Sequence, residues 1–173
     1  ACVHACGVDA IDHNMVVREE HIKVGAVILA PGYQIYRSEL SEEFGFGRYP
    51  NVITSLQFER LLSASGPTLG HVQRPSDGQA PKSVAFIQCA GSRDQDHLPY
   101  CSTVCCRTSL KQAAMIREQL PDTKVYVLYK DLRSPAQFEL FYQKIQEDEG
   151  IFLTKGEVTE VQPNGSAVAV RMT

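Results

Sequence analysis

Four cysteines gather in one short stretch of the chain, at Cys89, Cys101, Cys105 and Cys106. Four cysteine thiolates are the usual ligand set of a [4Fe–4S] cluster. The spacing Cys-x11-Cys-x3-Cys-Cys is unusual. Neighbouring residues of a helix point in different directions, so Cys105 and Cys106 can bind one group only where a helix begins at or just after them. We interpret this stretch as a cluster site.

Other readings of the same thiols remain open. Four thiolates also hold structural zinc, although zinc ligands usually come as two pairs of closely spaced cysteines. Cys105 and Cys106 could form a redox-active vicinal pair, or the thiols could simply be buried. The six cysteines of the chain favour metal ligands or redox groups over a disulfide framework, because no export signal is recognisable. His97 lies inside the loop and is a weak candidate ligand.

A second cysteine pair, Cys2 and Cys6, begins the chain with a Cys-x3-Cys spacing. This resembles the tail of the bacterial ferredoxin motif Cys-x2-Cys-x2-Cys-x3-Cys-Pro, without its first two cysteines and with Gly7 where proline is usual. We expect an incomplete iron–sulfur site here. The start has neither an initiator methionine nor the charged and apolar regions of a signal peptide, so we interpret the chain as a fragment.

The elements around the four-cysteine stretch predict a β-α-β unit. Residues 83–88 and 124–128 are short apolar runs typical of strands, and 103–120 has helical periodicity. In a nucleotide-binding unit the loop after the first strand carries Gly-x-Gly-x-x-Gly, because bare backbone must approach a pyrophosphate. Here the loop reads CAGSRDQDHLPYCSTVCC, with one glycine and four thiols. The position that elsewhere holds phosphate is therefore predicted to hold a group that needs sulfur.

Positive charge is expected around this loop. The N-terminus of a helix favours the thiolate form of cysteine, and Arg93, Arg107 and Lys111 lie nearby in sequence. Lys130 and Arg133 follow the second strand, where NADP-dependent proteins place cations for a 2′-phosphate. Without a glycine-rich loop they have no nucleotide to serve.

Residues 15–18 and 21–30 are rich in β-branched side chains and predict strands. Val27 to Leu29 form an apolar run that ends at Pro31-Gly32, which suits a strand buried on both faces of a parallel sheet. We expect a Gly-rich loop at 39–50, a helix at 55–62 with Ser55 as N-cap, and a Gly/Pro-rich linker at 66–82. A second helix is expected at 135–149. Strands are expected at 151–154, 157–161 and 167–172, the last two joined as a hairpin.

Composition excludes two classes of partner. No apolar run reaches the roughly 18 to 20 residues that span a bilayer, and hydrophobic residues make up 43% of the chain, so we expect a soluble protein without direct membrane insertion. The formal net charge is -3 with both signs scattered, which argues against nucleic-acid binding.

Most of the chain resembles one family. The runs PNVITSLQFERLLSASGPTLGHVQRPSDG, SVAFIQCAGSRD, YCSTVCC and KVYVLYKDLR are similar to the A subunit of heterodisulfide reductase and its relatives in anaerobic electron-transfer complexes. The YCSTVCC element and its upstream cysteine are specific to that group. The strand-loop-helix context is shared with thioredoxin-reductase-like flavoproteins in general.

The resemblance implies a cytoplasmic, FAD-carrying subunit of thioredoxin-reductase-like fold, with an inserted ferredoxin module and a cluster in place of pyridine nucleotide. Its partners would be other subunits of a heterodisulfide reductase-like or hydrogenase-linked complex, and its flavin could split an electron pair between two acceptors. The four clustered cysteines match the group's unusual cluster ligands. Ala30, Pro31 and Gly32 match the Ala-Thr-Gly strand end beside FAD, with proline replacing threonine. Lys111 resembles a flavin-proximal lysine, although a solvated helix-face lysine is an equal alternative.

We therefore expect an α/β fold with a ferredoxin tail at 1–14, part of an FAD-binding domain and a linker at 15–81, and a Rossmann-like cluster-bearing domain at 82–173. The expected function is electron relay between the cluster and FAD, since no acid-base pair or nucleophile for substrate chemistry stands out. The rival functions are a zinc-stabilised interaction module and a thiol-disulfide oxidoreductase. Because no second Gly-rich turn is present for the FAD pyrophosphate, this chain alone is expected to hold FAD weakly or not at all.

Overall fold

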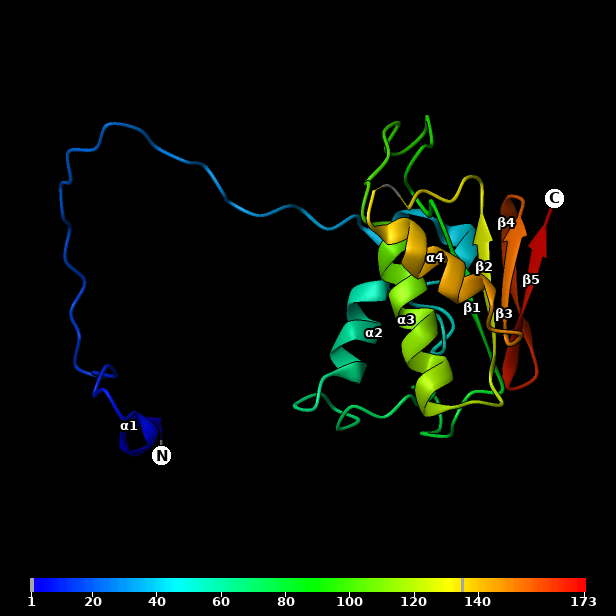
Figure 1. Ribbon diagram of the computed structural model, residues 1–173, viewed down its shortest axis with the longest axis horizontal. Coiled ribbons are helices and arrows are strands. Elements are labelled where there is room, and N and C mark those ends of the chain that lie inside the picture. The colour runs from blue at the N-terminus through cyan, green and yellow to red at the C-terminus, as the bar shows by residue number, and fades with distance from the viewer. Residues whose placement is uncertain (1, 135) are drawn as a thin grey trace. The chain divides into compact units, whose positions relative to one another are not determined.

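The computed structural model describes residues 2–134 and 136–173. Contacts divide the chain into two units, Ala1–Gln34 and Ile35–Thr173, which are described separately. The first unit has one short helix, α1, at Cys2–Ala5, and no helix or strand in the part described from residue 6 to residue 34. The second unit contains all the other elements (Figure 1).

The second unit contains a three-stranded parallel sheet in the order β1-β2-β3, from β1 (Ser83–Ile87), β2 (Lys124–Tyr129) and β3 (Ile151–Lys155). Helix α3 (Cys105–Gln119) connects β1 to β2, and α4 (Phe138–Gln146) connects β2 to β3. Parallel neighbours need such crossovers, so the chain forms two consecutive β-α-β units. The expected α/β class is confirmed to this extent. The Rossmann-like assignment and the ferredoxin remnant stay predictions.

A separate antiparallel hairpin closes the chain, formed by β4 (Val158–Asn164) and β5 (Ala167–Met172). It confirms the predicted hairpin, with Pro163 inside β4 and the turn at Gly165, whose φ is +61°. Figure 1 shows the hairpin on one side of the parallel sheet and the helices α3 and α4 on the other. Before the sheet come two 3-10 turns and one helix, at η1 (Ser38–Leu40), η2 (Glu42–Phe44) and α2 (Ser55–Leu62).

The core lies between the helices and one face of the parallel sheet. Strand side chains alternate between faces, so Val125 and Val127 are fully buried under α3, while Tyr126 points away and stacks on Phe152 with ring centroids 5.0 Å apart. Helix α3 contributes Leu110, Ala113 and Ile116, whose three-residue spacing places them on one face of the helix. The whole buried cluster consists of Phe58, Val72, Leu110, Ala113, Ile116, Val125, Val127, Ile145 and Ile151.

The predicted strands at 15–18 and 21–30 are wrong for this structure. Val27, Ile28 and Leu29 are 74%, 93% and 85% exposed, and the backbone around them forms no strand. A strand buried on both faces depends on neighbouring strands for its hydrogen bonds and on covering elements for its side chains. The part of the first unit that the structure describes offers neither.

Two smaller expectations also change. The N-cap of α2 is Thr54 and not Ser55, because the Thr54 hydroxyl accepts from the Gln57 amide while the Gln57 side chain accepts from the Thr54 amide, which is a capping box. Residues 66–82 have no helix or strand, as expected of a linker, but Val72 is 4% exposed and belongs to the core. That segment is therefore part of the packed second unit.

Among the helices that the structure describes, none is both long enough and apolar enough to cross a membrane.

Candidate metal centre

The long loop between β1 and α3 folds back on itself. The Gln88 amide donates to the Leu128 carbonyl at 2.9 Å, which keeps the chain beside β2 up to the first cysteine of the loop. The returning arm is then tied to the outgoing arm by the Ser92 and Ser102 hydroxyls, 2.6 Å apart, and by the Arg93 amide donating to the Tyr100 carbonyl at 3.0 Å. This folding brings Cys101 back toward Cys89.

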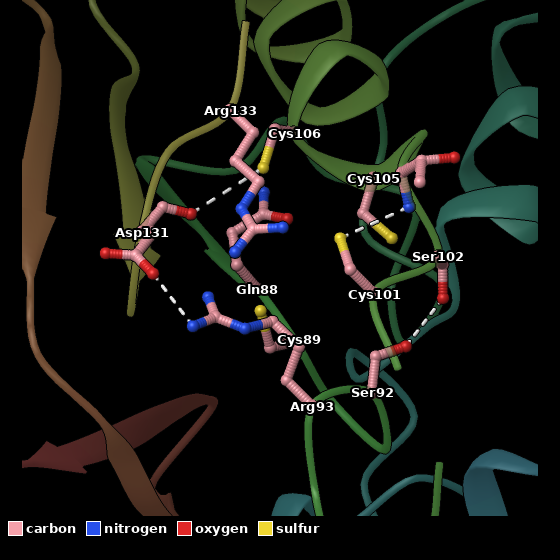
Figure 2. A pocket seen from close by; sticks show the side chains of 11 residues that line it. Gln88, Cys89, Ser92, Arg93, Cys101, Ser102, Cys105, Cys106, Asp131 and Arg133 are labelled. Atoms are coloured by element: carbon pink, nitrogen blue, oxygen red, sulfur yellow. Dashed lines mark hydrogen bonds and ion pairs between the residues drawn. The ribbon is translucent and has the colours of Figure 1, made fainter. Parts of the chain in front are cut away.

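All four predicted loop cysteines line one small pocket (Figure 2). The pocket is formed by the end of β1, both arms of the loop, the first turn of α3 and the residues after β2. Its wall consists of Gln88, Cys89, Ser92, Arg93, Cys101, Ser102, Thr103, Cys105, Cys106, Asp131 and Arg133. Helix α3 begins at Cys105, which meets the condition that the adjacent cysteine pair set for sharing one group.

The backbone of the pocket is held in conformations that side chains rarely adopt. Cys89, Arg93 and Thr103 have φ angles of +59°, +55° and +62°. Left-handed conformations of non-glycine residues cost free energy and concentrate at functional sites. Gly91 has a φ of +75° and packs against the ring of Tyr36, where a Cβ would overlap the ring carbons. The single glycine of the loop is thus required by both its φ and its close neighbour.

Burial raises the pKa of the Cys89 thiol, although the nearby Arg93 guanidinium opposes this. Burial also raises the pKa of the Cys105 thiol, against a hydrogen bond from Ser102. The negative charges of the other thiolates add to both increases, with Cys106 acting on each of them. Cys101 and Cys106 are therefore close enough to Cys89 for their negative charges to raise its pKa. Binding a metal here would release protons and would weaken as the pH falls.

The pocket also contains charged groups. Arg93 Nη2 donates to Asp131 Oδ2 at 2.8 Å, and Arg133 lines the same pocket. The Cys106 thiol donates to the Asp131 carbonyl at 3.9 Å, so the segment after β2 contacts both the loop and α3 (Figure 2). The N-terminus of α3 has no side-chain cap and no acidic residue in its first turn. Two arginines and this helix end favour an anionic occupant.

The donor set matches what an iron–sulfur cluster needs, since four thiols share one wall with cations around them. Within the described residues, no three His, Cys, Asp or Glu side chains are gathered closely enough to hold a metal ion. The cavity that these residues line is small, with a volume of about 20 Å³.

The other predicted cations lie elsewhere. Lys111 Nζ lies 2.8 Å from Glu59 Oε1 of α2 and does not line the pocket. The guanidinium of Arg107 lies over the Phe138 ring, 4.6 Å from its centroid, and Lys130 pairs with Glu157 at 2.6 Å. Of the three cations expected around the loop, Arg93 lines the pocket. Arg133, for which the sequence suggested no ligand, lines it as well.

His97 makes an edge-on contact with the Tyr36 ring, with centroids 5.7 Å apart, and does not line the pocket. In the first unit Cys2 is exposed, and the Cys6 sulfur accepts from the Ala10 amide at 3.3 Å. That bond leads the causes that lower the pKa of the Cys6 thiol.

Ala30, Pro31 and Gly32, the expected flavin contacts, are exposed and belong to no helix or strand. Their role, like that of Lys111, stays a prediction.

Sequence reasoning missed five polar residues of the pocket: Gln88, Ser92, Ser102, Thr103 and Asp131. Asp131 follows the carboxyl end of a parallel strand, which is where ligand-binding residues gather in α/β sheets. Its position in the sequence could therefore have identified it as a site residue. The serines and Gln88 carry no such signal, because their place depends on how the loop folds back.

Comparison with known proteins gives the chain a family. The iron-sulfur A subunit of CoB–CoM heterodisulfide reductase from Methanocaldococcus jannaschii is 45% identical over 157 residues, which are 90% of this chain and 24% of the relative. The A subunit of the H(2):CoB-CoM heterodisulfide,ferredoxin reductase of Methanothermobacter marburgensis is 46% identical over 165 residues, 94% of this chain and 25% of the relative.

A third relative, the A subunit of the ferredoxin/F(420)H(2)-dependent CoB-CoM heterodisulfide reductase of Methanosarcina acetivorans, is 44% identical over 162 residues, 92% of this chain and 20% of the relative. No family model matches the chain. The chain spans a quarter or less of the length of these three relatives. Over nearly its whole length it is homologous to one part of them, and it belongs to the family of heterodisulfide reductase A subunits.

Proposed function

We propose that this chain is the cluster-bearing part of an electron-transfer subunit, in which the four pocket cysteines hold a [4Fe–4S] cluster that exchanges electrons with FAD. The observation that carries the proposal is the pocket itself. Cysteines as far apart in sequence as Cys89 and Cys106 meet at the start of one helix, in a chain whose relatives include a named iron-sulfur subunit.

The residues of the chain have distinct tasks in this proposal. The four thiols provide the ligands. Arg93 and Arg133, with the uncapped N-terminus of α3, offset the negative charge that four thiolates bring. Asp131 holds the Arg93 guanidinium at the pocket wall. When bound, the cluster would supply one-electron transfer, and no residue of the pocket needs to act as an acid or base.

The finer parts of the proposal extend beyond this chain. Ala30, Pro31 and Gly32 in the first unit, and Lys111 in the second, are the residues proposed to contact the flavin. The subunit would work in the cytoplasm with the other subunits of a heterodisulfide reductase-like or hydrogenase-linked complex, with electron bifurcation as one mode of action. The names of two relatives, which pair heterodisulfide with ferredoxin, support such a role.

The test is purification without oxygen, followed by iron and acid-labile sulfide analysis and a visible spectrum. We expect about four irons and four sulfides per pocket, with broad absorption near 400 nm. Cys105→Ser should remove most of this iron, because it removes one of the four thiols. Cys2→Ser, in the other unit, is the matched control and should leave the iron of the pocket in place.

The rival functions predict different results. A zinc module would contain zinc and be colourless. A thiol-disulfide oxidoreductase would lose its activity on Cys105→Ser and contain no metal. A folded chain that has never met oxygen and yet contains neither iron nor sulfide would refute the cluster.

A further inference from the structure

Two buried donors at the wall of the cysteine pocket have no hydrogen-bond acceptor. They are Gln88 Nε2 and Arg93 Nη1, and in the described part of the chain these are the two buried side-chain nitrogen or oxygen atoms left without a partner. The Gln88 residue is only 6% exposed. Leaving a buried donor unpaired costs folding free energy, so such atoms are rare and call for an explanation. Because both atoms belong to residues that line the same pocket, we expect their hydrogen-bond acceptor to lie inside that pocket.

The two donors are held in place from different sides. Gln88 continues β1, and its amide donates to the Leu128 carbonyl of β2 at 2.9 Å, which fixes the base of its side chain. Arg93 lies on the loop, and its Nη2 donates to Asp131 Oδ2 at 2.8 Å. This hydrogen bond fixes the guanidinium and leaves Nη1 without a partner. Figure 2 shows both side chains among the cysteines.

The acceptor that these donors suit is anionic and lies beside the thiols. Among the described residues that line the pocket the one acid is Asp131, and it is already paired with Arg93 Nη2. Sulfur atoms carrying negative charge are the acceptors that the proposed function brings into this pocket. Hydrogen bonds to cluster sulfurs are one of the means by which a protein sets the reduction potential of a cluster.

We propose that Gln88 and Arg93 are positioning residues that donate hydrogen bonds to the sulfur atoms of the cluster and raise its reduction potential. The inference rests on the proposed function. On reduction the bound cluster would gain one electron from a reduced donor, for which the flavin is proposed, and the donor would lose that electron without any bond forming or breaking. The added negative charge strengthens both hydrogen bonds, so the donors stabilise the reduced form more than the oxidised form.

The test is a redox titration of the full chain followed by EPR spectroscopy, after iron and sulfide analysis. Gln88→Leu removes a donor at similar volume, and Arg93→Met removes a donor and a charge. Both variants should keep their iron and titrate at more negative potentials. We expect the ratio of reduced to oxidised cluster at the wild-type midpoint to fall about tenfold for Arg93→Met, a shift of about 59 mV for one electron. Gln88→Leu should shift less in the same direction, and Arg93→Lys should recover part of the change.

Two control variants separate a local effect from a general one. Gln143→Leu makes the same exchange on the exposed side of α4. Arg107→Gln removes a cation that is next to Cys106 in sequence but lies over Phe138 and outside the pocket wall. Neither control should move the midpoint by more than a small part of the Arg93→Met shift.

The outcomes distinguish the two proposals. A folded wild-type chain without iron and sulfide overturns the proposed function. A loaded wild type whose midpoint is unchanged in both Gln88→Leu and Arg93→Met overturns this inference alone and leaves the cluster in place. Should Gln88→Leu lose iron, Gln88→Glu keeps the side-chain shape and must lower the potential further. Loss of iron from every variant at both positions, in folded chains, would contradict a tuning role.

Discussion

Gly91 is the single residue on which the shape of the cysteine loop depends most. Its φ of +75° suits glycine, and the Tyr36 ring occupies the space that a Cβ would need. The Tyr36 hydroxyl is in turn held by Ser41, with the two oxygens 2.9 Å apart. A side chain at position 91 must therefore displace the ring or distort the backbone.

We predict that Gly91→Ala lowers the free energy of unfolding by about 1–3 kcal/mol and reduces the iron content of the purified chain. The reason is the sum of backbone strain and overlap with Tyr36. Chemical denaturation and iron analysis measure the two effects. Gly78→Ala is the matched control, because Gly78 has a φ of +69° with open space around it. Equal losses in the two variants would show that the Tyr36 contact has no influence.

At the same scale, the sequence predicted the thiols better than their surroundings. The four cysteines were recognisable because their residue type and their adjacency constrain the chemistry. Gln88 and Asp131 enter the pocket because a long loop closes on itself and a second strand ends beside it. That closure depends on contacts such as the Ser92–Ser102 hydrogen bond, which residue types alone do not reveal.

At the scale of elements, α2 and α3 are joined by a polar network. Gln112 is fully buried in α3, and its Nε2 donates to the Ser55 carbonyl of α2 at 3.1 Å and to Glu59 Oε1 at 2.9 Å. Lys111 pairs with the same carboxylate. The hydrogen bond from Lys111 is the main cause that lowers the pKa of Glu59 below its ordinary value of 4.5.

This shift gives a pH-dependent contribution to stability with a definite sign. Because the pKa of Glu59 is lower in the folded chain, its contribution is complete above pH 4.5, the unfolded value, and is lost as the pH falls through the folded value. We predict that Glu59→Gln removes roughly 0.2–1 kcal/mol of stability at pH 7 and less at pH 3. Urea unfolding at both values, in a double-mutant cycle with Lys111→Met, measures it. A difference from wild type that grows as the pH falls would contradict the assignment.

The success of element prediction depended on how local each element is. Helix α3 and strands β1 to β3 were predictable because their apolar periodicity is matched by packing within about 100 residues of chain. The run Val27 to Leu29 has an equally strong strand pattern and yet stays exposed. A pattern states what a segment could bury, whereas burial itself needs partners.

At the scale of the whole molecule, the site and the core share one unit. Every residue of the pocket wall and of the buried cluster lies within Ile35–Thr173. The sequence placed the start of the cluster-bearing domain at residue 82 instead. A chain that began at residue 82 would be less stable, because it would lack Phe58 and Val72 of the core.

We predict that a chain of residues 35–173 keeps the iron content of the full chain and its free energy of unfolding to within about 0.5 kcal/mol. A chain of residues 82–173 should lose at least about 3 kcal/mol, because removing one buried phenylalanine side chain alone costs about that much. Denaturation curves and iron analysis of the three chains give the comparison. If 82–173 proved as stable as 35–173, α2 and the segment after it would be accessory to the cluster-bearing domain, and the boundary inferred from the Gly/Pro-rich run would be the correct one.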